Sequence, residues 1–88
     1  MKRITELHAY EQCYIICKDD NGYWGINTEM LDENGCLKQQ INGIQGNLSE
    51  TLADCISQCR AEAKVKHLVG TGLTIIEAIQ QVHAEMIA

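Results

Sequence analysis

The spacing of apolar residues changes near Gly46, and the change divides the chain into two parts with different predicted secondary structure. Before Gly46, short apolar runs alternate with turn signals, as in antiparallel strands. After Gly46, apolar residues recur every three or four positions, as on one face of an amphipathic helix. We therefore predict an α+β fold in which strands are followed by helices.

The first predicted hairpin is centred on Asn21-Gly22. This pair separates residues 12–18 from residues 23–27, and both runs are rich in residues that favour strands. Because Asn and Gly tolerate the positive φ that a type I′ turn requires, the pair is a strong hairpin signal. We expect two antiparallel strands here.

A third strand is predicted over residues 36–44, which follow a second Asn-Gly pair at 34 and 35. Leu37 and Ile41 would point to one face of it. A third Asn-Gly pair, at 42 and 43, either ends this strand or forms a bulge in it. Residues 1–46 are thus predicted to form a three-stranded antiparallel meander.

The first predicted helix spans residues 47–70. Asn47 is a suitable N-cap, and Glu50, three residues later, has the spacing of a capping box. Gly70 is a residue that commonly ends a helix. One apolar stripe, made of Leu48, Leu52, Ile56, Cys59 and Ala63, repeats at helical spacing. We expect this stripe to pack on the sheet.

The second predicted helix lies within residues 71–88 and opens with the capping box of Thr74 and Glu77. Its apolar stripe consists of Ile75, Ile79, Val82 and Met86. This helix could pack beside the first, cover the other face of the sheet, or bind another chain. A homodimer would complete a core this small, and a monomer with both helices on one face of the sheet fits the pattern equally well.

Composition indicates one domain over residues 1–88, with 45% hydrophobic and 22% charged residues. The net charge of -5 argues against binding to nucleic acid or to anionic membranes, because affinity for them depends on Lys and Arg. The same charge suits a basic protein partner. No run of 18 apolar residues is present to span a membrane.

Five cysteines cannot all pair within the chain, and no apolar signal segment precedes them, so we expect free thiols in a reducing cytoplasm.

Two C-x-x-x-C spacings occur, CYIIC at 13–17 and CISQC at 55–59. In a strand, Cys13 and Cys17 would be about 13 Å apart and could not share an ion. In a helix, Cys55 and Cys59 share a face and could provide two ligands of a tetrahedral metal. They also lie where the helix must face the core, so packing is the favoured interpretation and metal binding the alternative.

Four residues near the first hairpin are candidates for binding a protein partner. Asp19 and Asp20 would form an acidic rim, although they are also ordinary turn residues. Tyr23 and Trp24 could be exposed anchors, although half-buried strand aromatics are common.

No catalytic motif or cofactor-binding loop is found in the sequence, so we expect neither catalysis nor a cofactor.

Residues 14–59 contain three motifs that resemble the N-terminal domain of HicB-type antitoxins. The motifs are Asp20-Asn21-Gly22-Tyr23-Trp24, Glu29-Met30-Leu31 and Gly46-Asn47-Leu48-Ser49-Glu50-Thr51-Leu52. That family consists of small acidic modules that bind and block a basic ribonuclease toxin. The resemblance implies a hairpin-and-helix module with a basic protein partner.

The sequence as a whole therefore predicts a cytoplasmic, non-enzymatic, acidic protein that acts by binding another protein. It could neutralise a toxin, act as a phage-type inhibitor, or regulate by self-association as a homodimer. The alternative is a small thiol or metal protein that uses Cys55 and Cys59 for zinc or redox chemistry.

Overall fold

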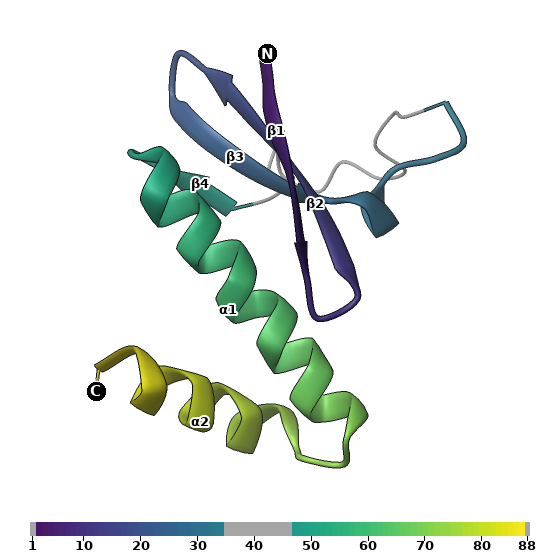
Figure 1. The fold of residues 1–88 in the computed structure, drawn as a ribbon, viewed down its shortest axis with the longest axis vertical. Coiled ribbons are helices and arrows are strands. Elements are labelled where there is room, and N and C mark those ends of the chain that lie inside the picture. The colour runs from purple at the N-terminus through teal and green to yellow at the C-terminus, as the bar shows by residue number, and fades with distance from the viewer. Residues whose placement is uncertain (1, 35–46, 88) are drawn as a thin grey trace.

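The computed structural model describes residues 2–34 and 47–87, and within them an antiparallel sheet is followed by two helices (Figure 1). The elements are β1 (Lys2–Ala9), β2 (Gln12–Asp19), β3 (Gly22–Asn27), the short 3-10 helix η1 (Thr28–Met30), β4 (Asn47–Ser49), α1 (Leu52–Gly70) and α2 (Ile75–Ile87). The sheet order is β1-β2-β3-β4. The α+β fold is confirmed, but the sheet has four strands rather than three. The strand predicted over residues 36–44 lies outside the described residues.

Strand β1 was not predicted, because its sequence is mostly polar and only Leu7 is buried. It pairs along β2, with Leu7 opposite Tyr14. The turn between the two strands contains Tyr10 and Glu11 at φ 47° and 68°. Such a turn usually contains Asn or Gly, so its sequence gives no hairpin signal.

The hairpin predicted at Asn21-Gly22 is confirmed, with Asp19 paired to Gly22 at its closed end. One Asp19 carboxylate oxygen accepts hydrogen bonds from the backbone N–H groups of Asn21 and Gly22, at 2.8 and 3.2 Å. Gly22 has φ 140°, and a Cβ there would lie 2.5 Å from the Ser49 carbonyl oxygen. The turn therefore requires glycine for its backbone conformation and for the approach of β4.

The predicted start of the first helix at Asn47 is wrong. Asn47–Ser49 pair with β3 as strand β4, and α1 begins at Leu52. Thr51 is the N-cap, and its side chain accepts a hydrogen bond from the Asp54 backbone N–H at 3.1 Å. Backbone pairing with β3 thus outweighs the local capping signal of Asn47 and Glu50.

The core lies between α1 and one face of the sheet. Its buried side chains are Leu7, Tyr14 and Ile16 from the strands, and Cys55, Cys59 and Ala63 from the helix. Burial raises the pKa of Tyr14 to about 12, with the nearby Glu62 carboxylate as the next cause. The expected packing of the first helix on the sheet is confirmed.

Helix α1 comes unusually close to the sheet at Gly25. A Cβ on Gly25 would lie only 2.2 Å from the Cys59 sulfur and 3.4 Å from the Cys55 sulfur. The Cys59 thiol therefore fills the space that any side chain at position 25 would need. Both thiols are fully buried by this contact.

Helix α2 packs beside α1 and away from the sheet (Figure 1). The capping box predicted at its start is present: the Thr74 hydroxyl accepts from the Glu77 backbone N–H at 3.2 Å, and the Glu77 carboxylate accepts from the Thr74 N–H at 3.0 Å. Only Ala78 and Val82 of the described α2 side chains are buried. Neither helix in residues 2–34 and 47–87 is long and apolar enough to cross a membrane.

The contact at Gly25 gives a direct test of the fold. We expect Gly25→Ala to lower the free energy of unfolding by about 2 kcal/mol, because the added methyl overlaps the Cys59 sulfur. Urea denaturation followed by circular dichroism measures this change.

A matched control is Gly70→Ala at the end of α1, where no atom lies within 4 Å of the added methyl. We expect this variant to be neutral or slightly stabilised. Combining Gly25→Ala with Cys59→Ala should cost less than the sum of the single changes, since the second change removes the overlapping sulfur. Additive losses would contradict the proposed contact.

Candidate functional site

The most exposed apolar region in the described residues lies on α2. Four large side chains form this region, which we call the α2 surface: Ile75, Ile76, Ile79 and Met86, exposed by 61%, 65%, 52% and 58%. Large apolar side chains gathered on one exposed face commonly mark an interaction site. The α2 surface is therefore the candidate functional site.

The helical repeat explains why these residues remain exposed. At about 100° per residue, Ile75, Ile79 and Met86 lie within roughly 40° of one another, beside the line of Ala78 and Val82 that faces α1. The apolar stripe of α2 is wider than the contact with α1, so one edge of it is buried and the other is not. Of the predicted stripe, Ile75, Ile79 and Met86 are exposed, whereas Val82 is buried at the contact between the helices.

A groove between α1 and α2 continues from the α2 surface. It encloses about 540 Å³, and its lining includes Val82 and Met86 of α2 and Ile56 of α1. Tyr10 closes one side of the groove from the turn between β1 and β2. The Tyr10 ring also lies 5.3 Å from the ring of His67, centroid to centroid, which helps to hold the turn against α1.

The charges around the groove are partly compensated within the molecule. The Lys64 ammonium of α1 forms an ion pair with the Glu85 carboxylate of α2, and this contact raises the pKa of Lys64. Arg60 also lines the groove. At the start of α2, the Thr74 backbone N–H binds the Glu77 carboxylate and lowers its pKa. Two of the charges beside the α2 surface, Glu77 and Glu85, therefore already have partners within the chain.

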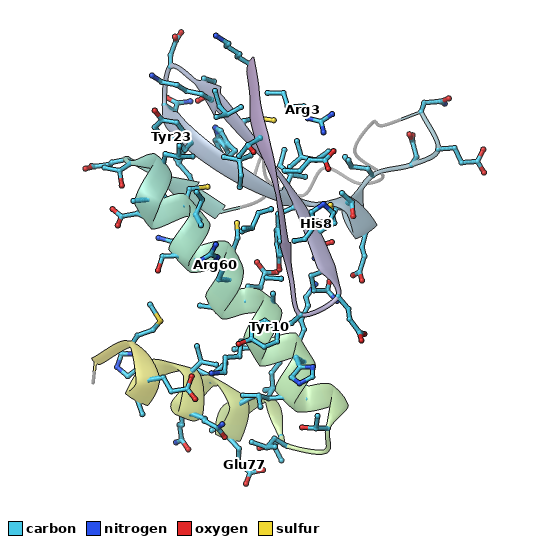
Figure 2. The ribbon with its side chains drawn as sticks, in the orientation of Figure 1. Arg3, His8, Tyr10, Tyr23, Arg60 and Glu77 are labelled. Carbon is cyan, nitrogen blue, oxygen red and sulfur yellow. The ribbon has the colours of Figure 1, made fainter. Side chains whose placement is uncertain are left out.

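The other predicted binding residues lie at the opposite end of the molecule, as Tyr23 and Glu77 show in Figure 2. Asp19 is bound to its own turn, and its pKa is lowered first by the Trp24 indole and then by the backbone N–H groups. Tyr23 packs against the core and lies 5.3 Å below the Lys18 ammonium. Asp20 is exposed. The structure does not bring this group together with the α2 surface.

The cysteines occupy two different environments. Cys55 and Cys59 are fully buried in the core, and burial raises the pKa of Cys55. Cys13 and Cys17 are half-buried on β2, out of phase with the core-facing Tyr14 and Ile16. No cluster of three or more potential metal ligands within the described residues includes Cys55 or Cys59. Cys36, the fifth cysteine of the chain, lies outside the described residues.

The sequence did not identify two residues of the site, Ile76 and Tyr10. Ile76 is outside the predicted stripe of the second helix, yet it is the most exposed of the four residues. Tyr10 gave no signal, because its position depends on the unpredicted β1 and its turn. An apolar residue next to the capping residues of a terminal helix is the sequence signal that could have identified Ile76.

Comparisons with protein-family models, with curated proteins and with solved structures find no match to this chain. The fold and the arrangement of its side chains are therefore the basis for inferring function.

The burial of the helical thiols predicts a difference in reactivity. In native protein under reducing conditions, we expect Cys55 and Cys59 to react with a thiol reagent at least about a hundredfold more slowly than Cys13, because they must wait for the structure to open. Mass spectrometry of peptides after timed labelling measures each site separately. In urea the rates of Cys13, Cys55 and Cys59 should converge, and equal rates in the native protein would contradict the core position of the helical pair.

Proposed function

We propose that this chain acts by binding protein, and that the α2 surface binds the α2 surface of a second copy of the chain. The observation that carries the proposal is the exposure of Ile75, Ile76, Ile79 and Met86 on a helix that contacts α1 alone among the larger elements. Association through this surface would remove from water the most exposed of the large apolar side chains among the described residues.

A two-fold arrangement suits this surface because the same exposed side chains are then buried in both copies. Burying a half-exposed Ile or Met contributes about 1 kcal/mol, so four residues in two copies contribute about 8 kcal/mol. Association itself costs at least about 4 kcal/mol in lost freedom of motion. With the cost at this lower bound, the net gain is about 4 kcal/mol, which corresponds to a weak dimer with a dissociation constant of about 1 mM; contacts along the groove would tighten it about tenfold for each 1.4 kcal/mol.

The charge distribution favours a second copy over a basic partner at this surface. The described part of α2 contains two acidic residues, Glu77 and Glu85, and both are bound within the chain. Little free negative charge therefore remains there to attract a cation. Asp19 and Asp20, the acidic residues predicted as a rim for a cationic partner, lie at the turn between β2 and β3, at the other end of the molecule.

Substitution at Ile79 tests the proposal. We expect Ile79→Glu to weaken dimerisation at least tenfold, because each copy would then place a carboxylate in an apolar interface. Sedimentation equilibrium over a range of concentrations up to about 1 mM measures the dissociation constant.

Gln81→Glu is a matched control, since it adds the same charge to an exposed position on the other side of the same helix. It should dimerise like the unmodified chain, and both variants should keep the unmodified unfolding midpoint. A strictly monomeric unmodified chain, or a dimer that Ile79→Glu leaves intact, would overturn the proposal. Binding of a basic partner that is lost on replacing Asp20 by Asn would point instead to the toxin-neutralising alternative.

A further inference from the structure

Three side chains with metal-binding atoms meet on the sheet face opposite the core. Glu6 and His8 are two residues apart in β1, so they point to the same face of the strand. Cys13 lies directly opposite His8 in the β1–β2 ladder. The intervening Leu7 is buried in the core, which places the three side chains on the outer face. Figure 2 shows His8 on β1, away from α1 and α2.

The distances among the three ligand atoms approach those of a tetrahedral site. His8 Nε2 lies 3.4 Å from Glu6 Oε2 and 3.9 Å from Cys13 Sγ. All three atoms lie within 4.8 Å of one another. With zinc bonds of about 2.0 Å to nitrogen or oxygen and 2.3 Å to sulfur, tetrahedral ligand atoms are roughly 3.3–3.6 Å apart. The His8–Glu6 pair already has this spacing, and the remaining adjustment requires only side-chain rotation at exposed or half-buried positions.

An ion pair links Glu6 to its neighbour Arg3. Arg3 forms an ion pair with Oε1 of Glu6, which leaves Oε2 facing His8. A residue that holds a ligand in this way favours binding by reducing the disorder of the unbound site. The Arg3 guanidinium also repels a cation, so Arg3 has opposing effects on affinity.

The donor set indicates which metal would bind. One imidazole nitrogen, one thiolate and one carboxylate oxygen are typical zinc ligands, whereas Ca²⁺ and Mg²⁺ require oxygen ligands. We propose that Glu6, His8 and Cys13 bind one Zn²⁺ ion on the outer face of the β1–β2 hairpin. The fourth position is left to water or to a group from another molecule, as in zinc sites with three protein ligands. This site is distinct from Cys55 and Cys59 and does not depend on dimerisation.

Titration with Co²⁺ and Zn²⁺ in the presence of a non-thiol reductant tests the site. We expect one Co²⁺ per chain with a near-ultraviolet thiolate-to-metal charge-transfer band, which added Zn²⁺ displaces. Competition with a chromophoric chelator gives the zinc affinity. That affinity should fall as the pH is lowered, because protons compete with the metal for His8 and Cys13.

Matched variants identify the ligands. Cys13→Ser should abolish the charge-transfer band and weaken Zn²⁺ binding at least tenfold, and His8→Ala should weaken it similarly. Cys17→Ser, on the same face of the same strand but outside the cluster, should leave the band and the affinity unchanged. Circular dichroism and urea unfolding of each variant check that the fold is kept. Absence of metal binding by the unmodified chain, or equal effects of Cys13→Ser and Cys17→Ser, would overturn the proposal.

Discussion

The contact between Gly25 and Cys59 determines how the rest of the molecule is arranged. With no side chain on Gly25, the Cys59 sulfur can lie against the backbone of β3. Cys55 and Ala63, one helical turn before and after Cys59, are also small, so α1 stays close to the sheet along this length. The core is thin as a result, and it is filled from the strand side by larger residues such as Tyr14 and Ile16.

The position of α1 in turn leaves α2 with little to cover. Among the described residues, α1 covers the inner face of the sheet, and α2 packs along α1, where it buries Ala78 and Val82. The large apolar side chains along the rest of its stripe stay at least half exposed. The α2 surface therefore stays exposed in the single chain, and the proposed association with a second copy would bury it.

The sequence predicted the elements whose signals are local and missed those that depend on distant pairing. The Asn21-Gly22 hairpin and the Thr74 capping box each require only a few adjacent residues, and both are present. Strand β1 is mostly polar and ends in a turn without Asn or Gly, so its presence depends on pairing with β2. At Asn47, pairing with β3 replaces the helix start that the capping pattern favoured. The apolar stripe of α2 could thus be predicted from its spacing, although its exposure could not, and neither could the Glu6–His8–Cys13 cluster.

The two C-x-x-x-C spacings illustrate how one pattern acquires different chemistry from its surroundings. In α1, both thiols face Gly25 and are fully buried, so their small volume is the property that the fold uses. In β2, the outward alternation places Cys13 beside His8 of the neighbouring strand, where its sulfur is available to a metal. A cysteine thus becomes a candidate ligand through its cross-strand neighbour rather than through the cysteine four residues away. Strand register, which the sequence did not reveal for β1, is the constraint that separates the two roles.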